Sequence, residues 1–171
     1  MNSGIIGLSK KELEIVSWLE FYQKHFFNLD DVNKFFRSKS QKYNSIKNLL
    51  KKKRIIKLAR RKYYLIPIKA KSGSWVENPF IMADEIFDGK DYFIGCFAAA
   101  NYWKLTDQIP AQIDIYTTKR QGKKTLLNTR FIFHRTTKKN IARKAIKASI
   151  GKHEFKILSK KEAKEWLKSK K

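Results

Sequence analysis

The sequence predicts an α+β fold, with an N-terminal winged helix-turn-helix (residues 1–70) followed by a smaller mixed α/β domain (residues 71–171). Two observations predict it. Residues 38–67 combine apolar side chains at helical spacing with two short β-prone runs directly after them. The net charge also changes sign along the chain, from +12 over residues 1–70 to −4 over 71–114 and +16 over 115–171. This change indicates a second domain with a task of its own.

Composition places the chain among basic proteins that attract polyanions. It has 171 residues, 42% of them apolar, and a formal net charge of +24, so it can build cores while binding nucleic acid or an anionic surface. No apolar run approaches ~18 residues and no signal-peptide pattern opens the chain, so we expect no membrane association. The single Cys96 excludes an internal disulfide and a multi-cysteine zinc site. We expect a cytoplasmic protein without a cofactor.

Two helices are predicted before the central stretch. Ser9 and Glu12 form a capping box. Apolar residues spaced by three and four then mark one helical face that includes Tyr22 and runs through Phe27. Two acidic residues follow and indicate the positive end of a second helix with Val32 on its buried face.

The central stretch predicts a third helix and a basic hairpin. Ile46 and Leu49 share one helical face, whereas Asn44 and Asn48 point the opposite way. Two β-prone runs follow, with four residues, 59–62, at the cationic tip between them. A helix that presents amides and ammonium groups beside a basic wing suits the major groove and flanking phosphates of duplex DNA. The alternative is a solvated basic helix beside an ordinary hairpin.

The predicted DNA-binding residues lie on the front of the third helix and at the hairpin tip. They are Lys42, Asn44, Ser45, Lys47, Asn48, Lys51, Lys52, Arg60, Arg61 and Lys62.

The second domain is predicted to follow a linker at residues 68–78. Pro79 suits the first turn of a helix that runs to Phe87. A short strand should end at Ile94, and a helix of small residues should follow Gly95. The remaining expectations are strands at 112–118 and 130–136 around a basic loop at 119–124, a loosely helical segment at 138–150, a strand at 153–158 and a last helix after Ser159.

A segment of this second domain resembles a known family. Residues 92–110 read YFIGCFAAANYWKLTDQIP, and the downstream strand reads FIFH. Together with the basic winged helix, this pattern resembles the AbiEi-type antitoxins of type IV toxin–antitoxin systems. The resemblance implies an N-terminal domain that binds operator DNA and represses its own operon. It also implies a second domain that counters a nucleotidyltransferase-like toxin, without a need for direct contact between the two proteins.

Two other classes of function remain open from the residues alone. The first is a metal-dependent nuclease guided by the winged helix, for which Asp84 and Asp88 on one helical face and Asp114 near Lys119 are weak indications. A solvated helix face is the simpler explanation for the first pair. The second class is an RNA-binding protein that holds its ligand with the basic C-terminal region. We find no P-loop, dinucleotide-binding glycine pattern, HExxH or CxxC motif.

Overall fold

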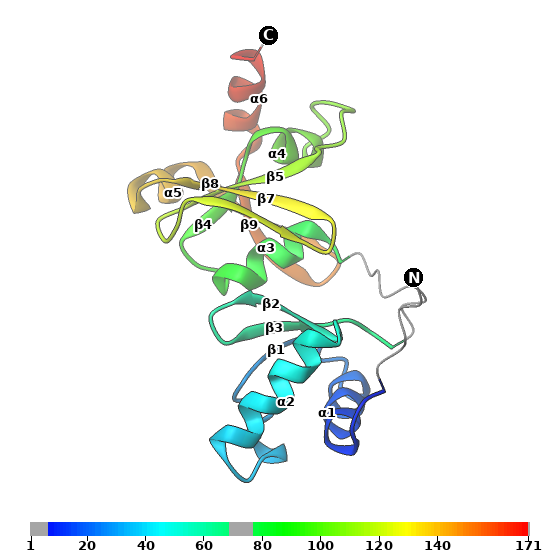
Figure 1. Cartoon of the computed structure of the whole chain (residues 1–171). Coiled ribbons are helices and arrows are strands. Elements are labelled where there is room, and N and C mark those ends of the chain that lie inside the picture. Colours follow the sequence, from blue (N-terminus) through cyan, green and yellow to red (C-terminus); the bar gives the residue numbers. More distant parts are fainter. Residues whose placement is uncertain (1–6, 69–76, 171) are drawn as a thin grey trace. The chain divides into compact units, whose positions relative to one another are not determined.

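The computed structural model describes residues 7–68 and 77–170 (Figure 1). Six α-helices and two β-sheets within these residues confirm the α+β class. The chain divides into two compact units, Met1–Trp75 and Val76–Lys171. The second unit is the longer of the two, not the smaller as expected. Residues 69–76 of the predicted linker lie outside the described residues.

The first unit contains two long helices and a three-stranded antiparallel sheet of order β1-β3-β2. Its elements are α1 (Lys10–Phe21), β1 (Phe26–Asn28), the 3₁₀ turn η1 (Asn33–Phe35), α2 (Lys39–Lys51), β2 (Ile55–Ala59) and β3 (Lys62–Leu65). One apolar core joins α1 and α2 to the sheet, and its fully buried members include Ile15, Leu19, Leu49 and Leu65. The predicted third helix and hairpin are therefore confirmed, as α2, β2 and β3.

The first two predicted helices differ from the structure. The helix after Ser9 ends at Phe21 rather than Phe27, because Gln23 adopts a φ of 51° and turns the chain. Residues beyond the turn form β1, which pairs with β3, and Tyr22 is 60% exposed rather than buried. The second helix is only the single turn η1.

The two acidic residues before η1 explain why no longer helix forms there. The Asp31 carboxylate accepts a hydrogen bond from the backbone N–H of Asn28 at 2.6 Å and pairs with Lys24 at 2.7 Å. Burial opposes ionisation of Asp31, but these contacts outweigh it and lower its pKa. The Asp30 carboxylate is held by Arg61 at 2.7 Å. Both side chains therefore hold turns in the loop instead of starting a helix.

The second unit is built on a six-stranded mixed sheet of order β6-β7-β5-β4-β9-β8. The pairs β4–β9 and β5–β7 are parallel and the other neighbours are antiparallel. Its elements are α3 (Pro79–Phe87), β4 (Tyr92–Ile94), α4 (Cys96–Tyr102), β5 (Gln112–Thr117), β6 (Gly122–Leu126), β7 (Thr129–Arg135), α5 (Lys138–Lys144), β8 (Ala145–Ile150), β9 (His153–Leu158) and α6 (Lys160–Lys168).

Helices cover both faces of this sheet (Figure 1). On one face α3 packs through Phe87, whose ring lies 5.3 Å from that of Tyr92 and 5.9 Å from that of Phe133. Successive residues of a strand point to opposite faces, so Phe93 faces the other side, where α4 and α6 pack together through Phe97 and Trp166. Both faces of β4 are therefore buried.

Two predictions for this unit are wrong in part. Part of the expected basic loop at 119–124 forms β6, which pairs with β7. The segment at 138–150 is helical only as α5 and continues as β8, because β9 offers its edge along the full length of β8 and Gly151, at φ 59°, closes the hairpin.

The strand ending at Ile94, the helices α3 and α4 and the final capped helix are confirmed. None of the helices within the described residues is both long and apolar enough to cross a lipid bilayer.

One buried ion pair joins the two long helices of the first unit. Glu12 completes the capping box with Ser9 and is only 2% exposed. Lys52, at the end of α2, donates to the Glu12 carboxylate at 2.5 Å and to the Gly7 carbonyl at 2.8 Å. Burial opposes ionisation of Glu12, but the hydrogen bonds from Lys52 and Ser9 and the charge of Lys52 outweigh it. The pKa of Glu12 is therefore lowered.

We predict that Glu12→Gln lowers the free energy of unfolding at neutral pH by about 1–3 kcal/mol, because Lys52 loses its charged partner in a poorly solvated position. Since the folded pKa of Glu12 lies below its ordinary value of 4.5, the difference between wild type and variant should be full above that value. The difference should be lost as the pH falls from 4.5 through the lower folded pKa of Glu12. Urea denaturation across pH measures this. Glu14→Gln, on the exposed side of α1, is the control, and an equal loss in both variants would contradict the role of Glu12.

Candidate nucleic-acid interface

The front of α2 is a continuous polar surface. Asn44, Lys47, Asn48 and Lys51 are exposed along one side of the helix, and Ser45 is half-buried at its margin. The opposite side is held in the core by Ile46 and Leu49, which are 4% and 0% exposed. The helix cannot rotate without exposing these two side chains, so its amides and ammonium groups stay directed to solvent.

The hairpin tip presents two arginines. Ala59 and Lys62 are paired across β2 and β3, which leaves Arg60 and Arg61 as the exposed connection between the strands. Arg61 adopts a φ of 61° and donates to Asp30 at 2.7 Å. Both side chains of this pair are more than half exposed, so the pair is weak and leaves the guanidinium accessible.

Three predicted contact residues are buried or form bonds within the protein. Lys52 is 15% exposed and pairs with Glu12, and Lys62 is 9% exposed. Lys42 is half-buried and donates to Asn33 at 2.7 Å. The other seven predicted residues lie on the exposed front of α2, at its margin or at the hairpin tip. The structure does not favour Lys52 and Lys62 as contacts to a ligand.

Sequence reasoning missed a hollow at the start of α2. A depression of about 250 Å³ is lined by Asn33, Phe36, Arg37, Ser38, Lys39 and Lys42. It borders the N-terminus of a 13-residue helix capped by Ser38, where free N–H groups and the helix dipole favour an anion. The signal was present in the sequence, because three cations fall between residues 37 and 42 around a capping serine. The hollow can accept a phosphate beside the polar front of α2.

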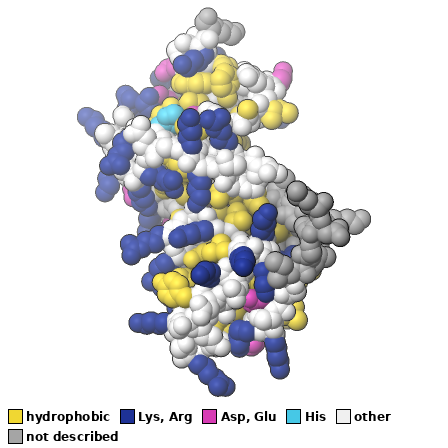
Figure 2. Space-filling model, viewed as in Figure 1, with side chains coloured by type: hydrophobic (Ala, Val, Ile, Leu, Met, Phe, Trp, Pro, Cys, Tyr) yellow, Lys and Arg dark blue, Asp and Glu magenta, His cyan; other side chains and the backbone are white. Residues whose placement is uncertain are grey.

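Among the charged side chains on the face drawn in Figure 2, Lys and Arg predominate over Asp and Glu, as they do in the sequence. Such an excess favours binding to phosphate backbones of any sequence. The amides of Asn44 and Asn48 add the capacity to distinguish bases, since an Asn side chain can donate and accept at once.

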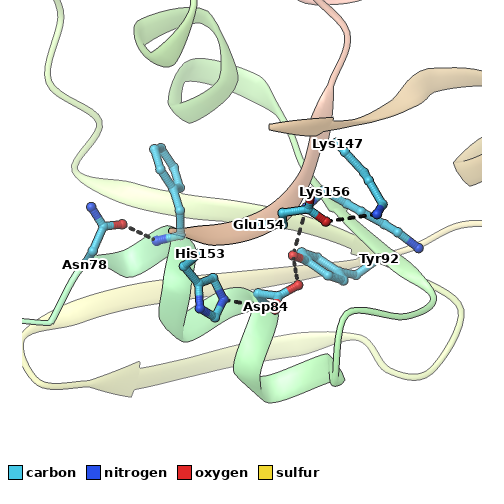
Figure 3. Close-up of polar contacts among 8 residues, drawn as sticks. Asn78, Asp84, Tyr92, Lys147, His153, Glu154 and Lys156 are labelled. Carbon is cyan, nitrogen blue, oxygen red and sulfur yellow. Dashed lines mark hydrogen bonds and ion pairs between the residues drawn. The ribbon is translucent and has the colours of Figure 1, made fainter. Parts of the chain in front are cut away.

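The carboxylates considered as nuclease residues do not converge. Asp84 accepts a hydrogen bond from the Tyr92 hydroxyl at 2.7 Å and contacts His153 Nε2 at 3.1 Å (Figure 3). The Tyr92 hydroxyl also accepts the backbone N–H of Lys156 at 3.0 Å. Burial and the Asp84 contact raise the pKa of Tyr92, so it stays a neutral donor. These bonds join α3 to β4 and β9, which is a structural role for Asp84.

Asp114, also considered as a nuclease residue, contacts other residues than the expected Lys119. Asp114 contacts His134 Nε2 at 2.7 Å and the amide of Gln112, not Lys119. The contact arises because β5 and β7 are parallel neighbours that place both residues on one face of the sheet, diagonally across the strand pair. Within residues 7–68 and 77–170, no group of three or more His, Cys, Asp and Glu side chains is placed to hold a metal ion.

Comparison of the chain with models of known protein families finds no match. A search of curated proteins also finds no significant match.

Proposed function

We propose that the first unit is a winged helix-turn-helix that binds duplex DNA, with α2 as the recognition helix and the β2–β3 hairpin as the wing. The carrying observation is the polar front of α2, held outward by Ile46 and Leu49, together with the exposed Arg60–Arg61 tip of the hairpin that follows. The order α1, β1, η1, α2, β2, β3 supports the proposal, although η1 is a single turn where such domains usually place a second helix.

Duplex DNA suits this surface better than an irregular polyanion. An α-helix fits the major groove, about 12 Å wide, and α2 exposes Asn44 and Asn48 on successive turns. The hollow at its N-terminus offers a phosphate site at one end, and the hairpin tip offers two further cations. Phosphate contacts of this kind would fix the position of the protein on DNA, while contacts from the α2 amides to bases would select the sequence.

We further propose that the chain acts in the cytoplasm as an AbiEi-type transcriptional regulator. It would repress its own toxin–antitoxin operon and counter a nucleotidyltransferase-like toxin through the second unit. The resemblance in residues 92–110 supports this assignment. In the structure, this segment supplies β4 and α4, and Ala98, Ala99 and Ala100 are fully buried. The loop after α4 is then held by the Asn101 amide, which donates to the carbonyls of Thr106 and Gln108.

The base-reading role of α2 gives the first test of this proposal. Asn48→Ala should weaken binding to the operator by about 1–3 kcal/mol while leaving binding to random duplex nearly unchanged, because only the operator offers the matched base edge. Fluorescence anisotropy with both duplexes measures the difference. Ser17→Ala, on the exposed side of α1, should change neither affinity. An equal fall for both duplexes would show that Asn48 does not read bases.

The wing gives a second test. Replacing Arg60 and Arg61 together with Ala should weaken binding to all duplexes alike. It should also flatten the log–log salt dependence by nearly two, at ~0.9 for each lost phosphate contact. The double variant Lys10→Ala and Lys11→Ala removes the same charge from α1 and should leave the slope nearly unchanged. If the slope stays unchanged in the wing variant, the hairpin does not contact DNA.

The antitoxin role is tested separately from DNA binding. Ala99 is fully buried in α4, so Ala99→Leu should overpack the second unit at a cost of about 1–3 kcal/mol. We expect this variant to lose protection of cells that express the toxin encoded beside it, while operator binding by the first unit persists. Ala142→Leu, at an exposed position of α5, should keep both activities. Full protection by the destabilised Ala99→Leu protein would argue against an antitoxin role for this unit.

A further inference from the structure

The second unit contains a cleft that DNA binding does not use. It lies over the sheet between α5 and α6, and its volume is about 340 Å³. Apolar and aromatic side chains, among them Phe93, Tyr116 and Trp166, line it together with Asn140, Glu162 and Glu165. A cleft of this size and mixed lining is at the small end of the range for sites that bind small molecules.

Aromatic side chains form one side of the cleft. The rings of Phe93 and Tyr116 are parallel within 7° at 5.0 Å, and His134 stacks on the other side of Tyr116 at 4.8 Å. Gly95 makes this arrangement possible, because a Cβ there would come within 2.7 Å of the Tyr116 ring. Trp166 belongs to α6 and is fixed edge-on against Phe97 at 5.0 Å. Phe93 and His134 thus cover both faces of the Tyr116 ring. The half-buried Trp166 ring is the flat lining surface that favours a planar ligand.

The polar groups of the cleft have spare hydrogen-bonding capacity. The Asn140 amide donates only a long 3.5 Å bond to Thr136, and its side-chain oxygen has no partner among the described residues. It can therefore donate to and accept from the edge of one heterocycle. Glu165 forms no ion pair with any residue that the structure describes, and Glu162 keeps a second carboxylate oxygen beyond its bond to Lys144. Carboxylates of this kind accept hydrogen bonds from hydroxyl groups.

The charged side chains that line the cleft are two carboxylates and one lysine, unlike the basic excess of the whole chain. Lys144 neutralises Glu162 at 3.1 Å. Lys170 lies 6.0 Å from the ring of Trp166, on the same helix end as Glu165. A chain of net charge +24 therefore has here a site with two carboxylates and no excess of cations. Phosphate would be repelled by the carboxylates and would find no unpaired partner within the lining.

We propose that this cleft binds a nucleoside without a phosphate, a neutral planar nitrogen heterocycle that carries sugar hydroxyls. The base lies against the Trp166 ring, and Asn140 recognises its edge. Glu162 and Glu165 accept the sugar hydroxyls. The assignment is independent of DNA binding by the first unit, and it can fail or hold whatever the outcome of the DNA experiments.

The only cysteine of the chain provides a reporter inside the cleft. Cys96 lines it, with its Sγ atom 3.3 Å from the Tyr116 hydroxyl. Burial raises the pKa of its thiol, so its reaction with Ellman's reagent should be slow in the free protein. A molecule seated in the cleft should slow it further. This readout separates occupancy of the cleft from non-specific binding elsewhere on a basic surface.

The experiment titrates the full chain with adenosine, guanosine, cytidine and uridine by calorimetry and repeats each titration while following Cys96 modification. We expect at least one nucleoside to bind saturably at one site per chain and to protect Cys96 in proportion to occupancy. The matching 5′-monophosphate should protect at least about tenfold less well at the same concentration. Failure of all four nucleosides to protect Cys96 would overturn the proposal, and so would equal protection by the monophosphate.

A matched pair of variants on α5 locates the base-reading group. Asn140→Ala should weaken binding of the protecting nucleoside about 5- to 10-fold, the ordinary effect of one lost hydrogen bond. Lys139→Ala changes the exposed neighbour and should leave the affinity unchanged. Circular dichroism shows whether both variants remain folded. Glu162→Gln is a further variant, in which the proposed acceptor for the sugar hydroxyls is altered. Unchanged affinity in both Asn140→Ala and Glu162→Gln would overturn the assignment.

Discussion

Burial of one side of α2 is the constraint on which the proposed interface depends. Ile46 and Leu49 enter the core made by α1 and the sheet, and each such side chain contributes roughly 1.5–3 kcal/mol when fully buried. Rotating the helix to hide its amides would expose both. The packing energy therefore decides which side chains meet solvent, and Asn44, Asn48 and Lys51 face outward as a consequence rather than through contacts of their own.

The hairpin beside α2 depends on a third strand in the same way. An isolated two-stranded hairpin is at best marginally stable in water, and a tip that carries two arginines adds repulsion. Here β1 pairs with β3 along its length, and Phe27 stacks on Tyr63 with ring centroids 5.7 Å apart. Asp30, two residues after the end of β1, pairs with Arg61 at the hairpin tip. The segment between the two long helices thus stabilises the hairpin, which is a different role from that of a second helix.

The sheet of the second unit brings together aromatic and polar side chains that are distant in sequence. The neighbouring strands β4, β5 and β7 place Phe93, Tyr116 and His134 in one aromatic row, and the register of β5 against β7 brings Asp114 to His134. On the opposite face, Asp84, Tyr92 and His153 join α3 to the sheet. One face therefore carries a structural network, and the other carries a lined cleft. The two carboxylates of that cleft distinguish it from the strongly basic composition of the chain.

The sequence by itself determined the elements whose signals are local. The capping serines Ser9, Ser38 and Ser159, the proline that starts α3 and the helical spacing around Ile46 each depend on residues within one turn of one another. The α+β class and the outward face of α2 followed from them. Tertiary structure alone decided β1, β6 and β8, because a strand's stability comes from a partner elsewhere in the chain. It also decided that Lys52 and Lys62 are withdrawn from the surface and that the cleft beside Cys96 exists, since ion pairing, burial and cavities arise only when segments distant in sequence pack together.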